Sequence, residues 1–188
     1  LMPTDLFVRR ALLWLKWASE KRVTLTCSPN FGYRHCLRAL GDKTLDDHDL
    51  SSVRLVFNGA EPIAVELAEE FLDRLQPYGL ARTAMYPVYG LAEASLAVSF
   101  PVPGSVYRYI TVDRRSLGVG ATALHVAATD PMALRLMCEG KPIPYTSVRM
   151  VDDSGAEVPD GTVGHLLLSG DNVTAGYFQN PEANAAAF

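Results

Sequence analysis

Two short stretches of the sequence carry residues that could do chemistry. The first is Asn58-Gly59-Ala60-Glu61-Pro62. Gly59 and Ala60 lack bulky side chains, so a flat ring could approach the backbone there and form hydrogen bonds with it. A plain turn between a strand and a helix, with proline in the first helical turn, has the same composition. This stretch taken alone leaves both interpretations open.

The second stretch runs from Pro87 to Ala94 and contains Tyr89, Gly90 and Glu93. Tyr89 could stack on a base or a ribose, and Gly90 allows a tight bend of the backbone. Glu93 could hold a hard divalent cation near a phosphate, because such cations prefer carboxylate oxygens. A turn with a packed tyrosine and a solvated glutamate is the alternative interpretation, and it also stays open at this point.

The elements that precede the two stretches predict where they lie. Residues 23–27, 54–57 and 82–86 are short apolar runs typical of buried strands. Apolar residues recur at helical spacing over 31–40 and from Pro62 to Gln76, which predicts two helices. This alternating order predicts an α/β fold, with a parallel sheet covered by helices. Ligands of such sheets bind beyond the C-terminal ends of the strands, so both stretches are expected to form one cleft.

The two ends of the sequence predict different secondary structure. Residues 5–21 have an apolar stripe and predict a helix, with Thr4 as its N-cap. After Glu93 the sequence is β-rich and predicts a smaller, mostly antiparallel sheet or barrel. The expected strands are 95–100, 105–112, 145–151 and 163–168, and Asp152 to Gly155 is expected to be a turn. We therefore expect two parts: the end of an α/β subdomain over residues 1–100, and a β-rich subdomain, incomplete at its C-terminus, over 101–188.

Composition excludes several classes of function. The chain has 188 residues and a formal charge of −4, which removes the electrostatic argument for nucleic acid as a partner. No apolar run approaches the roughly 20 residues of a transmembrane segment. Its three cysteines, Cys27, Cys36 and Cys138, have no CxxC spacing, and a reduced cytoplasmic setting is the simplest expectation. The four histidines lack the paired spacing of a zinc site.

Taken together, the motifs resemble a known family. Asn58-Gly-Ala-Glu-Pro62 followed by Val88-Tyr-Gly-Leu-Ala-Glu-Ala94 resembles the adenylate-forming superfamily of acid-activating enzymes. Within it, the sequence is most similar to the fatty acyl-AMP ligases. The further blocks that fit this branch are Ser28-Pro-Asn-Phe-Gly-Tyr33, Thr111-Val-Asp-Arg-Arg-Ser-Leu117, Asp160-Gly-Thr-Val-Gly164 and Ser169-Gly-Asp-Asn-Val-Thr-Ala-Gly-Tyr-Phe178. The resemblance covers nearly the whole chain in order.

The resemblance implies a reaction in two steps with ATP and Mg²⁺. A fatty acid carboxylate attacks the α-phosphate of ATP, which gives acyl-AMP and pyrophosphate. The acyl group then passes to the phosphopantetheine thiol of an acyl carrier protein or carrier domain. The parent protein is expected to be a stand-alone ligase or a loading module of a polyketide or lipopeptide assembly line.

The resemblance also implies a role for each matching residue. The adenine pocket would be lined by Asn58, Gly59, Ala60, Glu61 and Pro62. Tyr89 would stack against adenine, while Gly90, Leu91 and Ala92 would run past the α-phosphate. Glu93 would bind Mg²⁺ and serve as the catalytic carboxylate. The junction of the acyl tunnel and the nucleotide would be formed by Asn30, Phe31 and Gly32.

Two features bear on the choice of branch. Ala92 stands where many members of the superfamily have a serine or threonine, and the Leu-Ala-Glu form is typical of fatty acyl-AMP ligases. Residues 112–132 fall where this branch carries an insertion that disfavours coenzyme A, although from the residues alone they are only a loop. An acyl-CoA synthetase and a non-catalytic adenylate-binding or interaction module of the same fold remain as alternatives. The family's phosphate loop, ribose-binding aspartate and catalytic lysine are not in this sequence, so the chain alone is not expected to complete adenylation.

Overall fold

The N-terminal half is built on a three-stranded parallel sheet. The computed structural model describes residues 2–188, and its sheet has the order β1 (Leu25–Ser28), β2 (Leu55–Asn58) and β3 (Met85–Pro87). Helix α3 (Asn30–Leu40) connects the first pair of strands and α4 (Val65–Leu75) connects the second. The predicted α/β fold with a parallel sheet and covering helices is confirmed.

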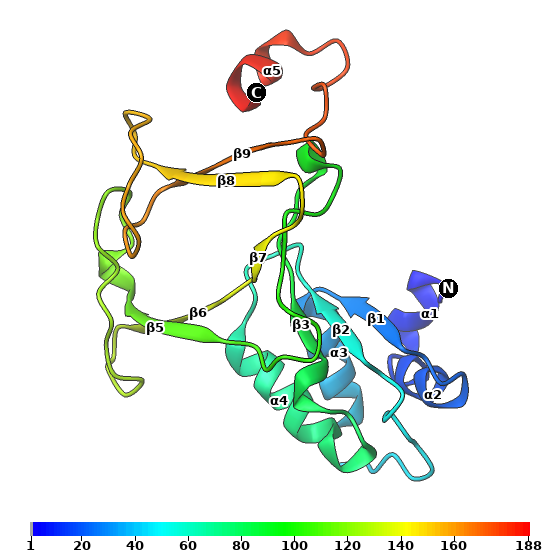
Figure 1. The fold of residues 1–188 in the computed structure, drawn as a ribbon. Coiled ribbons are helices and arrows are strands. Elements are labelled where there is room, and N and C mark those ends of the chain that lie inside the picture. The colour runs from blue at the N-terminus through cyan, green and yellow to red at the C-terminus, as the bar shows by residue number, and fades with distance from the viewer. Residues whose placement is uncertain (1) are drawn as a thin grey trace.

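Both connecting helices pack on the same face of this sheet (Figure 1). The strands follow one another in a single direction, and each right-handed crossover then places its helix on the same side. Along β2, Val56 and Asn58 are buried while Leu55 and Phe57 are partly exposed, so alternate residues face the helices. The core between sheet and helices contains Tyr33, Phe71 and Leu72, each at most 2% exposed. The opposite face of the sheet is left for other contacts.

The N-terminal segment forms two helices where one was expected. Helix α1 covers Thr4–Arg9 and α2 covers Leu12–Glu20, and the backbone leaves helical geometry at Arg10. Thr4 lies inside α1 and its hydroxyl caps nothing, because the capping position is taken by Pro3. Trp14 of α2 stacks on Phe71 of α4, at a ring-centroid distance of 5.9 Å.

Helix α4 begins three residues later than the sequence pattern indicated. Pro62 was expected in its first turn, but the helix starts at Val65. The reason is a competing partner: the Asn30 side chain donates to the Pro62 carbonyl at 2.8 Å and accepts from the Ala64 N–H at 3.2 Å. These bonds hold the segment of residues 62–64 against the start of α3, with Ala64 extended. Short 3₁₀ turns at Gln76–Tyr78 (η1) and Arg82–Ala84 (η2) lead from α4 to β3.

The C-terminal half consists of antiparallel pairs of strands, as expected, but they are separate ribbons. Within residues 2–188 the pairs are β4 (Ser99–Phe100) with β7 (Lys141–Pro142), β5 (Tyr109–Asp113) with β6 (Ala133–Met137), and β8 (Thr146–Val151) with β9 (His165–Gly170). The remaining elements are η3 (Ala92–Ala94), η4 (Arg114–Ser116) and α5 (Pro181–Ala187). A single closed barrel is therefore wrong for this part of the chain. Asp152 to Gly155 forms the expected turn, closed by the Gly155 N–H on the Asp152 carbonyl.

Strand β6 was not anticipated from the sequence, although it anchors the β5–β6 ribbon. Arg135 in its centre makes ion pairs with Glu69 at 3.0 Å and with Glu66 at 3.6 Å, both on α4. Its guanidinium also lies 5.3 Å from the ring centre of Tyr109. The loop of 118–126 then joins this ribbon to the next, because the N–H of Gly120 donates to the carbonyl of Val163 at 2.8 Å.

Within residues 2–188, no helix is both long enough and apolar enough to cross a bilayer.

Candidate functional site

The two stretches singled out from the sequence lie side by side at the C-terminal edge of the parallel sheet. Strands β2 and β3 end in register, with Asn58 opposite Pro87. The N–H of Val88 donates to the Asn58 carbonyl at 2.9 Å, which extends this pairing by one residue. A Cβ atom added to Gly59 would lie 2.6 Å from the Val88 carbonyl oxygen. The two turns therefore converge, and glycine is required for their close approach.

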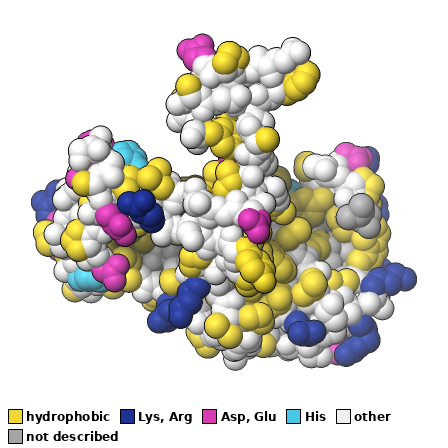
Figure 2. Space-filling view, turned by 45° about the horizontal axis from the view of Figure 1, so that its top comes forward, with side chains coloured by type: hydrophobic (Ala, Val, Ile, Leu, Met, Phe, Trp, Pro, Cys, Tyr) yellow, Lys and Arg dark blue, Asp and Glu magenta, His cyan; other side chains and the backbone are white. Residues whose placement is uncertain are grey.

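A cavity of about 360 Å³ opens where they meet. That volume falls within the range of known small-molecule sites. Its wall contains Gly59 and Ala60 from the first turn and Tyr89 and Gly90 from the second. The rest of the wall comes from Cys27, Ser28, Pro29, Phe57, Val88, Leu96, Ala97 and Phe100. Figure 2 shows hydrophobic side chains gathered in a hollow of the molecular surface.

Both backbone groups of Tyr89 are used by the fold, and its half-buried side chain lies in the wall of the cavity. The Tyr89 N–H donates to the Ser99 carbonyl at 3.2 Å, and its carbonyl accepts from Val98 and Ser99 at 3.0 and 3.1 Å. Gly90 follows at the closest point of the turn, where an added Cβ would lie 2.8 Å from the carbonyl carbon of Leu96. Leu96 itself has a φ of 108°, a region that side chains rarely adopt. The turn is tight and its conformation is strained.

Glu93 lies on η3, beside the cavity but not in its wall. Its carboxylate accepts a hydrogen bond from the Tyr177 hydroxyl, and its carbonyl accepts from the Thr174 N–H at 2.8 Å. The bond from Tyr177 lowers the pKa of the Glu93 carboxyl below its ordinary value, so the group is an anion at neutral pH. An anionic carboxylate is a suitable ligand for a hard divalent cation.

Glu93 would be a single carboxylate ligand for a cation at this place. Among the described residues, no three His, Cys, Asp or Glu side chains come together as a metal site. A cation at Glu93 would therefore take most of its ligands from phosphate oxygens and water, which is the usual way that Mg²⁺ is held. The space beside Gly59 and Gly90 is taken up by Val88 and Leu96, so these glycines serve the contact between the turns, and a flat ring would have to lie in the cavity itself.

Other residues predicted for the nucleotide pocket do not line the cavity. The Asn58 side chain is 1% exposed, on the buried side of β2, and neither of its polar atoms has a hydrogen-bond partner among the described residues. Glu61 and Pro62 are exposed beyond the first turn, and the Glu61 carboxylate accepts from the Phe31 N–H at 3.4 Å. Leu91 and Ala92 form the start of η3. These residues adjoin the lining residues in sequence but are not part of the cavity wall.

The three residues predicted for the acyl tunnel separate into different positions. Asn30 bonds to the loop of Pro62, and Gly32 is buried where a Cβ would lie 3.5 Å from the Phe7 ring. Only Phe31 lines a second, larger cavity of about 850 Å³ between β1 and the N-terminal helices.

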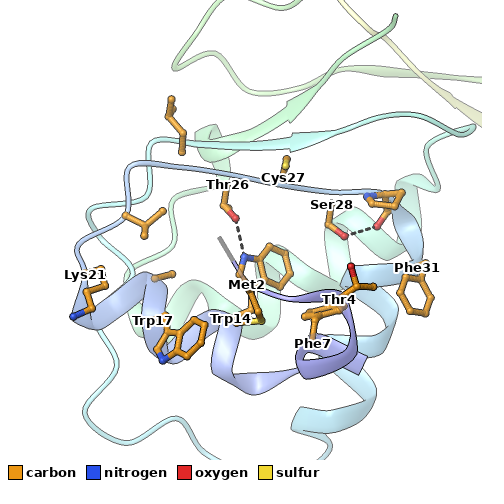
Figure 3. Close-up of a pocket in the computed structure, with 14 residues that line it drawn as sticks. Met2, Thr4, Phe7, Trp14, Trp17, Lys21, Thr26, Cys27, Ser28 and Phe31 are labelled. Atoms are coloured by element: carbon orange, nitrogen blue, oxygen red, sulfur yellow. Dashed lines mark hydrogen bonds between the residues drawn. The ribbon is translucent and has the colours of Figure 1, made fainter. Parts of the chain in front are cut away.

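This second cavity is mostly apolar (Figure 3). Phe7, Trp14 and Trp17 form much of its wall, and Trp14 donates its indole N–H to the Thr26 hydroxyl at 2.7 Å. Cys27, Ser28 and Pro29 belong to the walls of both cavities, so the end of β1 lies between them. Sequence reasoning missed Phe57, Leu96 and Phe100 in the smaller cavity. The alternation along β2 could have indicated Phe57, because residues next to buried ones on a strand face the other side.

Comparisons with known proteins show the family of the chain. Residues 1–178 match the family described as AMP-binding enzyme. The chain belongs to this family. It has 36% identity over 184 residues with a 4-hydroxyphenylalkanoate adenylyltransferase of Mycobacterium marinum, covering 97% of this chain and 29% of the relative. It has 36% identity over 193 residues with the long-chain-fatty-acid–AMP ligase FadD32 of Mycolicibacterium smegmatis, covering 100% of this chain and 30% of the relative.

A solved structure extends the likeness to three dimensions. The fatty acyl-adenylate ligase of Legionella pneumophila, in complex with acyl adenylate and pyrophosphate, has a TM-score of 0.92 and 32% identity to this chain. The match covers 100% of this chain and 32% of that one. The chain thus spans about 30% of the length of the curated relatives that it matches.

Proposed function

We propose that the full-length protein is a fatty acyl-AMP ligase, and that this chain supplies the adenine side of its active site. The protein would join a fatty acid to the AMP moiety of ATP and release pyrophosphate. The observation that carries the proposal is the convergence of the turns at 58–60 and 88–90 on one cavity of about 360 Å³. Similarity to relatives described as fatty acid–AMP ligases supports the choice of reaction.

The chain's residues have distinct tasks in this reaction. The backbone of Gly59 and Ala60 would contact the edge of the adenine, and the free ring of Tyr89 would stack on its face. Gly90, Leu91 and Ala92 would run past the α-phosphate. The Glu93 carboxylate would hold Mg²⁺, which when bound offsets the negative charge that builds up as the carboxylate attacks the α-phosphate. The Ala92 methyl group offers that phosphate no hydrogen bond.

The larger cavity is suited to the acyl chain of the substrate. It is apolar, and it shares the residues at the end of β1 with the smaller cavity. An acid could therefore present its carboxylate to the nucleotide while its chain lies against Phe7, Trp14 and Phe31. Burial of each methylene contributes about 0.8 kcal/mol, so kcat/KM should rise by roughly fourfold per added carbon until the cavity is full.

The acceptor of the acyl group is expected to be a carrier-protein thiol. Residues 112–132 match the place of the insertion that, in the resembling branch, disfavours coenzyme A. This segment bonds to residues 161–163 and so links two ribbons of the C-terminal half. All three cysteines are free thiols, which supports a reduced cytoplasmic location as part of the proposal.

Pyrophosphate release by the full-length protein tests the reaction. Straight-chain fatty acids of increasing length should support ATP-dependent release, and Glu93→Ala should lower it at both saturating and subsaturating Mg²⁺. Unchanged turnover of Glu93→Ala at both concentrations would remove Glu93 from the mechanism. Absence of release with every acid would favour a non-catalytic module of the same fold.

Two further measurements distinguish the proposed reaction from that of an acyl-CoA synthetase and from the adenylation of another class of acid. Release of acyl-CoA when coenzyme A is supplied, with no transfer to a phosphopantetheinylated carrier protein, would favour an acyl-CoA synthetase. A set of 4-hydroxyphenylalkanoates should be compared at matched chain length, because one relative is described as acting on such acids. Preference for them over plain fatty acids would change the substrate class but not the adenylation step.

A further inference from the structure

The segment before α5 is fastened to the turn that carries Glu93. The Asn172 side-chain amide donates to the carbonyls of Ala94 at 3.3 Å and Ala97 at 2.8 Å. The Thr174 N–H donates to the Glu93 carbonyl at 2.8 Å. Tyr177, 84 residues from Glu93 in sequence, donates its hydroxyl to Oε1 of the Glu93 carboxylate. In Figure 1 this segment passes beside the short helix η3 on its way to α5.

Tyr177 is itself held in place by α5. Its N–H donates to the Asn184 side-chain oxygen at 2.6 Å, and its carbonyl accepts from the Asn184 amide at 3.1 Å. The ring packs edge-on against Phe188, at a centroid distance of 5.6 Å. The hydroxyl is therefore directed at Glu93 by contacts on the backbone and on the ring. Among the described residues, no other side chain donates to the Glu93 carboxylate.

We propose that Tyr177 is a positioning residue for Glu93: its hydroxyl fixes one carboxylate oxygen and so keeps the other directed toward the cation that accompanies ATP. This inference rests on the metal role of Glu93 proposed above. A glutamate side chain has three rotatable bonds, and holding one oxygen removes conformational freedom that cation binding would otherwise have to remove. No side chain of the described residues donates to the second oxygen, which a cation ligand requires.

The alternative is that the bond only fastens the C-terminal segment to the turn. The two ideas differ in what Tyr177→Phe changes, because phenylalanine keeps the ring on Phe188 and loses only the hydroxyl. The matched control is Tyr145→Phe, since Tyr145 is 84% exposed and its hydroxyl has no hydrogen bond with the described residues.

The experiment measures ATP binding to the full-length protein by calorimetry across a Mg²⁺ series, without any fatty acid. Tyr177→Phe should raise the Mg²⁺ concentration needed for half of the metal-dependent gain in affinity by roughly tenfold, the scale of the conformational freedom that an unheld glutamate side chain must lose when it binds a cation. Binding of ATP without Mg²⁺, and the melting temperature of the metal-free protein, should match those of Tyr145→Phe. An unchanged Mg²⁺ dependence, or an equal loss of affinity with and without Mg²⁺, overturns the proposal.

The same measurement on Glu93→Ala, with and without Tyr177→Phe, shows which of the two proposed roles fails if one of them does. With the carboxylate removed, Tyr177→Phe should cause no further change in Mg²⁺ dependence; a further loss of similar size would mean a general structural defect and would also overturn the proposal. This comparison decides the matter even if Tyr177→Phe lowers the melting temperature. If Glu93→Ala itself leaves the Mg²⁺ dependence unchanged, the metal role of Glu93 fails. If Glu93→Ala changes it and Tyr177→Phe does not, only the positioning role fails.

Discussion

A single methyl group at Gly59 should disturb the cavity at the point where its two turns meet. The Cβ of Gly59→Ala would lie 2.6 Å from the Val88 carbonyl oxygen and 3.0 Å from the Val88 Cγ2 atom. Ordinary contacts between such atoms are closer to 3.5 Å, so the turns must separate by somewhat under 1 Å. Gly118→Ala is the matched control, because a Cβ there meets nothing within 4 Å.

The size of the effect follows from that displacement. Forcing a methyl group into a closely packed contact costs about 1–3 kcal/mol of folding stability. Replacing glycine by alanine also stabilises by about 0.4–1 kcal/mol through the unfolded chain, but both variants share this gain. The difference between Gly59→Ala and Gly118→Ala should therefore be about 1–3 kcal/mol. In a catalytic site, a misplacement of this scale lowers the rate by up to about 100-fold.

The assay is ATP binding and pyrophosphate release by the two full-length variants. Gly59→Ala should bind ATP at least roughly tenfold more weakly, since about 1.4 kcal/mol of lost contact corresponds to that factor. Its melting temperature should fall below that of Gly118→Ala, which should equal or exceed the parent. If Gly59→Ala binds ATP as tightly as Gly118→Ala does, the turn at 58–60 is not part of the nucleotide site.

Three further outcomes are expected. Cys27 is exposed and lines the smaller cavity, so iodoacetamide should modify Cys27 first, and bound ATP should protect it. Mass spectrometry identifies the modified residue. Early modification of Cys36, whose pKa is raised by burial to about 12, would contradict this prediction. Phe71→Ala should lower the free energy of unfolding by about 3–5 kcal/mol, because Phe71 is 2% exposed in the core; a loss below about 1 kcal/mol by denaturant titration would refute that packing. Arg135→Ala should speed amide hydrogen exchange in the β5–β6 ribbon, because the ion pair of Arg135 with Glu69 fastens that ribbon to α4. Unchanged exchange would show that other contacts are enough to hold the ribbon on α4.

The parallel sheet could be predicted because its signal is local. Strands β1, β2 and β3 are short apolar runs separated by helical periodicity, and the position of both turns at one edge follows from that order. The start of α4 could not be predicted in the same way. Its delay to Val65 depends on the Asn30 side chain, which competes for the backbone from more than thirty residues away.

The cavity walls also depend on contacts that periodicity does not reveal. Phe100 reaches the cavity because β4 pairs with β7, a contact across about forty residues. The partner of Glu93 is more distant still, since Tyr177 follows it by 84 residues. The motifs therefore indicated which turns meet at the cavity, but not which residues hold those turns in place.

Two asparagines illustrate why such supporting residues matter. Asn30 pairs with the backbone of the first turn through both its amide and its carbonyl, and Asn172 donates to two carbonyls of the turn that follows Glu93. Tight turns leave backbone groups that no strand or helix can satisfy, and a short side-chain amide supplies both donor and acceptor. One asparagine comes from a helix of the α/β half and the other follows the last ribbon of the β-rich half. The geometry of the site is thus a joint product of the two halves, although its proposed ligand contacts lie almost entirely in the first.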